Sequence, residues 1–236
     1  KKEIKNRQIK ILGVINASEE SAILMLSSLS ISAHHSICFE ELSPVAIKDR
    51  VRIFKPDIIL CRCQIESRLR EILNNSEFKE IPVLAINLNT KCHKFDLKAL
   101  DVNNYYCDNS NLFTLFTSGS TGLPKAVTHS ANRYIKYAKF TTKYFFGIKK
   151  GNCIFTATDA GWINGHTYAF YGPLLLGGVS VINENPLFIS LPRQLGEILD
   201  KTNPKCFYTS VTILRLLKST VRSDQTINDF SNNNLR

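Results

Sequence analysis

Short apolar runs alternate with longer helix-compatible segments along the first half of the chain, and this alternation constrains the fold most. The runs have strand character and cover residues 9–15, 35–39, 57–61, 81–86 and 112–117. The predicted helices are residues 19–31, the stretch after Pro44, a polar segment after residue 61, and about 130–145. Strands that alternate with helices pair in parallel, so the sequence predicts an α/β fold with a layered, largely parallel sheet and flanking helices.

Composition adds few constraints of its own. The chain has 236 residues, of which 44% are hydrophobic and 21% charged, which is typical of a globular chain with one large or two small domains. No run of about 18 apolar residues occurs, and the first ten residues, KKEIKNRQIK, lack the apolar core of a secretory signal. The sequence therefore predicts neither membrane insertion nor export, and we expect a cytoplasmic protein.

The distribution of charge and of cysteines limits which ligands and partners the sequence predicts. The formal net charge is +10, but the Lys and Arg residues are spread along the chain without an arginine-rich tract. We therefore expect no nucleic-acid partner, although a positive field also favours polyanions such as ATP and coenzyme A. The seven cysteines contain no C-x-x-C pair, so we expect reduced thiols and no metal site.

The strongest chemical signal is the string TSGSTGLPK at residues 117–125, directly after a predicted strand. Gly119 and Gly122 allow backbone conformations in which consecutive N–H groups face a polyanion. Hydroxyl donors and a mobile positive charge come from Thr117, Ser118, Ser120, Thr121 and Lys125. The alternative, a solvated Ser/Thr/Gly-rich surface turn, explains a shorter string such as GSTG better than it explains nine residues after a strand.

The string extended to TSGSTGLPKAV resembles the phosphate-loop signature of the adenylate-forming superfamily. This superfamily includes acyl-CoA synthetases, firefly-type luciferases and the adenylation domains of peptide synthetases. Ala126 departs from the pattern, which usually has glycine there. We expect its methyl group to leave the phosphate-facing groups in place.

A second block, residues 158–178, resembles the acetyl- and propionyl-CoA synthetases in particular, through D-x-G-W, then G-H-S/T-Y, then Y-G-P-L. Two shorter stretches, 35–44 and 206–217, resemble the same family and occur in the family's order. The resemblance implies that residues 1–236 are a partial AMP-binding domain from the large N-terminal domain of such an enzyme. It also implies a weakly matching connector at about 87–111.

The same resemblance implies a reaction in two steps. A short carboxylate, acetate or propionate, attacks the α-phosphate of ATP, which is bound with Mg²⁺, and the thiol of coenzyme A then displaces AMP. Residues 117–122 and Lys125 would bind the β- and γ-phosphates, Trp162 would form an aromatic wall of the acyl pocket, and Ile163 and Asn164 would lie at the pocket and the thiol channel. The family's mobile C-terminal domain with its catalytic lysine is absent from these residues, so we identify no catalytic residue and no magnesium ligand.

Several alternatives stay open at this point. Trp162 could be a core residue, and His166 could be a hydrogen-bonded structural histidine rather than a site residue. Asn164 stands where acetyl-CoA enzymes usually have threonine, and Leu187–Phe188 replace an asparagine near coenzyme A, so that contact is not carried over. The chain is expected to be a piece of a complete ligase; the alternative is a truncated, non-catalytic nucleotide-binding or interaction module.

Overall fold

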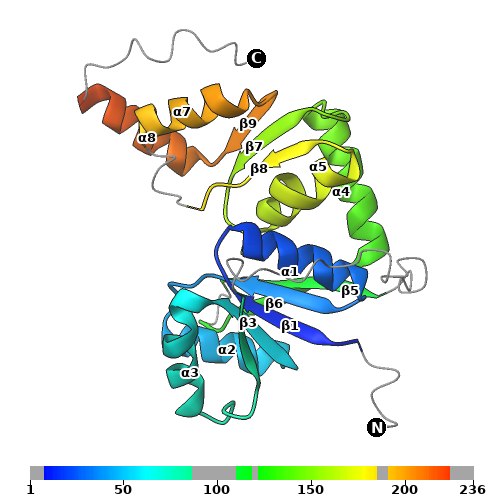
Figure 1. Ribbon diagram of the computed structural model, residues 1–236, viewed down its shortest axis with the longest axis vertical. Coiled ribbons are helices and arrows are strands. Elements are labelled where there is room, and N and C mark those ends of the chain that lie inside the picture. The colour runs from blue at the N-terminus through cyan, green and yellow to red at the C-terminus, as the bar shows by residue number, and fades with distance from the viewer. Residues whose placement is uncertain (1–7, 87–109, 119–121, 185–190, 224–236) are drawn as a thin grey trace. The chain divides into compact units, whose positions relative to one another are not determined.

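The chain divides into two compact units, and the division falls within one long helix. In the computed structural model (Figure 1), unit 1 comprises residues 1–134 and unit 2 residues 135–236. The structure describes residues 8–86, 110–118, 122–184 and 191–223. Each unit has its own sheet and its own core.

Unit 1 contains a six-stranded sheet in the order β4-β3-β1-β2-β5-β6. Its strands are β1 (Lys10–Val14), β2 (His34–Cys38), β3 (Ile58–Arg62), β4 (Val83–Ile86), β5 (Asn111–Thr117) and β6 (Lys125–Ser130). Every pair is parallel except β5–β6, which is antiparallel. The predicted largely parallel sheet is confirmed, but β6 was not predicted, because a helix was expected to follow the glycine turn.

Within the described part of unit 1, three helices cover the two faces of this sheet. They are α1 (Glu19–Ser30), α2 (Pro44–Phe54) and α3 (Glu66–Asn74), which follows the short 3₁₀ turn η2 (Cys63–Ile65). Alternate residues of a strand face opposite sides. Leu12 and Val14 pack with α2 and α3, whereas a Cβ at Gly13 would lie 2.8 Å from Leu24 Cδ1 of α1. Helix α1 therefore lies on one face and α2 and α3 on the other (Figure 1).

Unit 2 is built on a smaller parallel sheet in the order β8-β7-β9. Its strands are β7 (Cys153–Ala157), β8 (Val179–Val181) and β9 (Cys206–Thr209). Its helices are α4 (Ala131–Phe145), which begins in unit 1, the π-helix η4 (Gly165–Tyr171), α5 (Gly172–Leu175), α7 (Pro192–Thr202) and α8 (Val211–Ser223). Phe155 and Ala157 of β7 pack against α7 and α8, whereas Thr156 Oγ1 donates to the Tyr168 carbonyl of η4 at 3.0 Å. The two faces of β7 therefore carry different layers.

Other features noted in the sequence concern glycines, cysteines, membrane spans and the connector. Two glycines of unit 2 occupy positions where another residue would be strained or crowded: Gly177 has φ +66°, and a Cβ at Gly172 would lie 2.0 Å from Thr142 Oγ1. The five cysteines within the described ranges are free thiols, and in the same ranges no helix is long and apolar enough to cross a bilayer. The predicted connector at 87–111 lies outside the described residues except for its last two positions, and Leu187–Phe188 lie outside them as well.

Candidate functional site

The two ends of the glycine-rich string lie in the β5–β6 hairpin. Strand β5 ends at Thr117 and β6 begins at Lys125, and these two residues are directly opposite in the antiparallel ladder. Thr117 Oγ1 lies 3.5 Å from the Lys125 carbonyl oxygen. Residues 119–121, which include three of the predicted phosphate ligands (Gly119, Ser120 and Thr121), lie outside the described residues.

The described part of this loop suits an anionic ligand. Gly122 has φ +85°, a conformation that favours glycine, and no atom lies within 4 Å of a Cβ built there. The side chains of Thr117, Ser118 and Lys125 are all exposed. The hairpin therefore presents two hydroxyl groups and one ammonium group to solvent beside a backbone turn that only glycine adopts without strain.

The second predicted group, Trp162, Ile163 and Asn164, lies in unit 2, in the turn between β7 and the π-helix. Asp159 shapes this turn: its Oδ1 accepts a hydrogen bond from the Gly161 N–H at 2.9 Å, and its carbonyl accepts one from the Trp162 N–H at 3.2 Å. Trp162 is 55% exposed and Ile163 38%, whereas Asn164 is half-buried. The alternative that Trp162 is a core residue is therefore wrong for the described structure.

Buried polar groups of the π-helix hold this turn in place. His166 is 0% exposed, and its Nδ1 lies 3.3 Å from the Trp162 carbonyl oxygen. Thr167 Oγ1 donates to the Ile163 carbonyl at 2.7 Å. A Cβ at Gly165 would lie 2.1 Å from the Asp159 carbonyl oxygen, so the turn and the helix meet at a point that admits no side chain. His166 thus has the contacts of a hydrogen-bonded structural histidine, one of the two roles considered for it.

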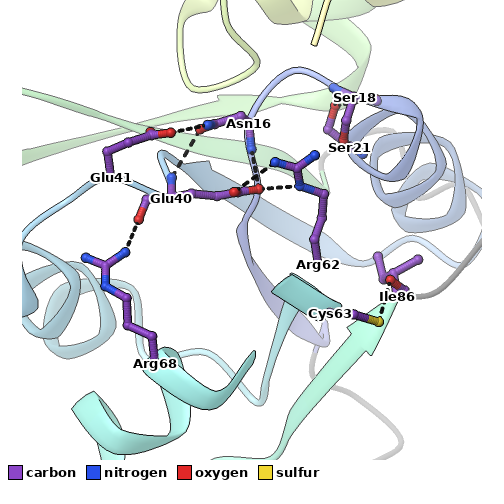
Figure 2. A network of polar contacts seen from close by, with 9 residues as sticks. All are labelled: Asn16, Ser18, Ser21, Glu40, Glu41, Arg62, Cys63, Arg68 and Ile86. Atoms are coloured by element: carbon purple, nitrogen blue, oxygen red, sulfur yellow. Dashed lines mark hydrogen bonds and ion pairs between the residues drawn. The ribbon is translucent and has the colours of Figure 1, made fainter. Parts of the chain in front are cut away.

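A third polar cluster, which sequence reasoning missed, lies where three parallel strands of unit 1 end (Figure 2). Glu40 accepts two hydrogen bonds from Arg62, at 2.6 and 2.9 Å, and one from the Asn16 N–H at 3.3 Å. Arg68 donates to the Glu40 carbonyl at 2.5 Å. Ligands of open α/β sheets bind at this carboxyl edge, but here the polar groups bind one another. The signal was present in the sequence, because Glu40 and Glu41 directly follow the predicted strand at 35–39.

The chemistry of these groups is that of positioning and charge neutralisation. The hairpin offers hydroxyls and an ammonium group, and the turn of unit 2 offers an indole ring and an amide. Within the described ranges, no group of three His, Cys, Asp or Glu residues could hold a metal ion.

Comparison with known proteins identifies the family to which the chain belongs. The family described as AMP-binding enzyme matches residues 9–235. An acetyl-coenzyme A synthetase of Psychromonas ingrahamii is 31% identical over 240 residues, which is 92% of this chain and 37% of that protein. Acetyl-coenzyme A synthetase 2 of Saccharomyces cerevisiae is 33% identical over 223 residues, 84% of this chain and 32% of that protein. The chain thus spans about a third of the length of these relatives.

A solved structure supports the fold. The crystal structure of Brucella canis acyl-CoA synthetase matches with a TM-score of 0.72 and covers 90% of this chain and 39% of that chain. The two sequences are 22% identical, so this likeness concerns the fold alone. The layered, largely parallel architecture is therefore one that a solved acyl-CoA synthetase also has.

Proposed function

Because the chain belongs to the AMP-binding enzyme family, we propose that it is part of an adenylate-forming ligase that joins a short carboxylic acid to coenzyme A. Residues 1–236 are then a partial AMP-binding domain of that ligase. The observation that carries the proposal is the β5–β6 hairpin, which pairs Thr117 with Lys125 and has Gly122 in a positive-φ turn. The similarity to two acetyl-coenzyme A synthetases supports acetate or propionate as the acid.

In the proposed first step, a carboxylate oxygen of the acid attacks the α-phosphorus of ATP. The bond from this phosphorus to the bridging oxygen breaks, pyrophosphate leaves with the electron pair, and an acyl-adenylate forms. The site must neutralise charge on the leaving pyrophosphate and align the carboxylate; it needs no protein nucleophile. Magnesium, when bound to ATP, neutralises part of the phosphate charge.

The hairpin would bind the β- and γ-phosphates. We assign this role to residues 117–122 and to Lys125, whose exposed ammonium group is suited to phosphate oxygens. Exposed hydroxyls at Thr117 and Ser118 can donate to the same oxygens.

The turn of unit 2 would bind the acid and guide the thiol. We assign Trp162 to the wall of the acyl pocket and Ile163 and Asn164 to the pocket and the thiol channel. In the second step the sulfur of coenzyme A attacks the acyl carbon, the carbon–oxygen bond to AMP breaks, and the thiol proton goes to solvent or to a base that we do not identify. The exposure of Trp162 and Ile163 and the anchoring of their carbonyls by His166 and Thr167 support this assignment.

Lys125→Ala tests the phosphate assignment. Isothermal titration of the purified chain with pyrophosphate and with Mg-ATP should show affinity about 10- to 100-fold weaker for the variant, since a hydrogen bond to a charged group contributes roughly 1.5–3 kcal/mol. The thermal unfolding temperature should change little, because an exposed lysine contributes little to stability. Lys79→Ala, at an exposed lysine elsewhere in unit 1, is the matched control and should bind like the unsubstituted chain. Equal affinity of Lys125→Ala and Lys79→Ala would contradict the assignment.

ATP–pyrophosphate exchange tests the reaction and the acid. We expect exchange that depends on acetate or propionate and is slower with butyrate, because the pocket is proposed for two or three carbons. Fastest exchange with butyrate would refute the short-acid assignment. Nucleotide binding without exchange for any acid would favour the alternative function, a non-catalytic nucleotide-binding module.

A further inference from the structure

The β5–β6 hairpin changes register close to its base. Asn111 is opposite Ser130, yet Phe113 is opposite His129, so Leu112 is an extra residue on β5. Beyond this bulge the pairs continue regularly to Thr117 opposite Lys125. A hairpin without the bulge would instead place Thr117 opposite Pro124 and turn every later side chain of β5 to the other face relative to β6. The sequence must therefore contain something that selects the bulged register.

Polar side chains from three neighbouring strands meet directly after the bulge. Thr114 and Thr128 are opposite in the ladder, and their hydroxyl oxygens lie 2.7 Å apart. His34 Nε2 of β2 lies 2.8 Å from the same Thr114 hydroxyl. Thr114 is 2% exposed and His34 4%, and the imidazole packs edge-on against Phe54 with ring centroids 5.0 Å apart.

The hydrogen bonds of this trio need the observed register. Thr114 has one hydroxyl proton, so it either donates to Thr128 and accepts from His34, or accepts from Thr128 and donates to His34. In the register without the bulge, Thr114 would be opposite Val127, which has no hydroxyl, and Thr128 would be opposite Phe113. The Thr114 hydroxyl would then lose its partner on β6 while buried, which is unfavourable. Only one register satisfies the chain of hydrogen bonds.

We propose that His34, Thr114 and Thr128 are positioning residues that select the bulged register of the β5–β6 hairpin and so hold Thr117 opposite Lys125. The trio does not touch the proposed phosphate ligands; it acts on them through the ladder. This inference rests on the proposed function for its effect on ligand binding, but its effect on the hairpin itself does not depend on any ligand.

The test compares two substitutions at one position. Thr128→Val keeps the shape of the side chain and removes the hydroxyl, whereas Thr128→Ser keeps the hydroxyl. Thr128 is itself exposed, so neither variant creates a cavity in the core. Thr141→Val is the matched control, because it makes the same chemical change in unit 2, where the hydroxyl bonds the Tyr137 carbonyl of its own helix. Hydrogen–deuterium exchange of peptides from residues 111–130 and calorimetric titration with pyrophosphate are measured for all three.

We expect Thr128→Val to speed exchange in this hairpin and to weaken pyrophosphate binding by about 10-fold, which is the loss of one net hydrogen bond. Thr128→Ser should restore both readouts, and Thr141→Val should change neither, although it lowers the unfolding temperature. Unchanged exchange in Thr128→Val, or failure of Thr128→Ser to restore it, would overturn the inference. If the unsubstituted chain binds no pyrophosphate, the proposed function fails, and the exchange measurement alone decides the register inference.

Discussion

At the scale of single residues, the ion pair between Glu40 and Arg62 should stabilise unit 1. The Glu40 side chain is 8% exposed and that of Arg62 20%. Removal of one partner leaves the other charge desolvated and uncompensated. We expect Glu40→Gln to lower the free energy of unfolding of unit 1 by about 2–3 kcal/mol, which is less than for a fully buried pair because Arg62 is partly open to solvent. Urea titration followed by hydrogen exchange in unit 1 would measure this loss.

The neighbouring carboxylate provides the control. Glu41 is exposed and accepts a hydrogen bond from Asn16 Nδ2 at 2.6 Å. Glu41→Gln should therefore be nearly neutral, because exposed polar contacts contribute little. If Glu40→Gln lowered the free energy of unfolding as little as Glu41→Gln, the network in Figure 2 would not contribute to the stability of unit 1.

The residues of the candidate site were only partly predictable. The string at 117–125 was identified because its glycines, hydroxyls and lysine are contiguous, so spacing alone carries the signal. The supporting contacts of Trp162 and Ile163 were not predicted, since they depend on the rotamers of His166 and Thr167 within the π-helix. The assigned roles of the site residues stay predictions until ligand binding is measured.

At the scale of elements, one glycine decides how closely α4 approaches α5, which continues from the π-helix. A Cβ at Gly172 would lie 2.0 Å from Thr142 Oγ1 and 2.7 Å from the Thr167 carbonyl oxygen. Gly172→Ala should therefore force these helices apart and destabilise unit 2 by about 1–3 kcal/mol, the usual range for overpacking. Thermal unfolding of the variant would measure the effect.

The control is the same substitution in another helix. Gly196 lies inside α7, and nothing lies within 4 Å of a Cβ built there. Gly196→Ala should raise stability by up to about 1 kcal/mol, because alanine favours a helix interior over glycine. If Gly172→Ala lowered the unfolding temperature and Gly196→Ala raised it, contact with Thr142, and not helix propensity, would determine the effect at Gly172. Stability changes in the same direction for both variants would contradict this explanation.

The elements themselves show where a single sequence is informative. The first five strands were predicted within a few residues, because short apolar runs alternate with longer helix-compatible segments along this part of the chain. Strand β6 was missed because its residues are mostly exposed, so an edge strand leaves little hydrophobic pattern. The π-helix was missed because its wider turn differs from an α-helix in hydrogen bonding and not in composition.

At the scale of the whole molecule, acid should destabilise unit 1. Burial and the nearby charge of Lys10 lower the pKa of His34 from 6.5 to about 4, and burial also lowers the pKa of His129. The unfolded chain therefore binds a proton on His34 at a higher pH than the folded chain does. Stability is fully present above about pH 6.5 and falls as the pH decreases to about 4, by roughly 3 kcal/mol from His34.

Denaturant titrations from pH 7 to pH 4 would measure this slope, with hydrogen exchange in unit 1 as the readout. His34→Gln removes the titrating group and should flatten the slope, even if the variant is less stable at pH 7. If the free energy of unfolding of His34→Gln depended on pH as steeply as that of the unsubstituted chain, groups other than His34 would cause the acid sensitivity.

The antiparallel contact between β5 and β6 has a consequence for the order of folding. Its two strands are neighbours in sequence, so their pairing closes only a short loop, whereas β5 must find β2 across a long stretch of chain. Local pairing of this kind forms early, and distant parallel pairing forms late. We therefore expect pulsed hydrogen exchange during refolding to show that the amide protons of the hairpin become protected before those of β2. Simultaneous protection of the two would contradict this order. The hairpin that is proposed to bind phosphate would then form before the rest of the sheet to which it belongs.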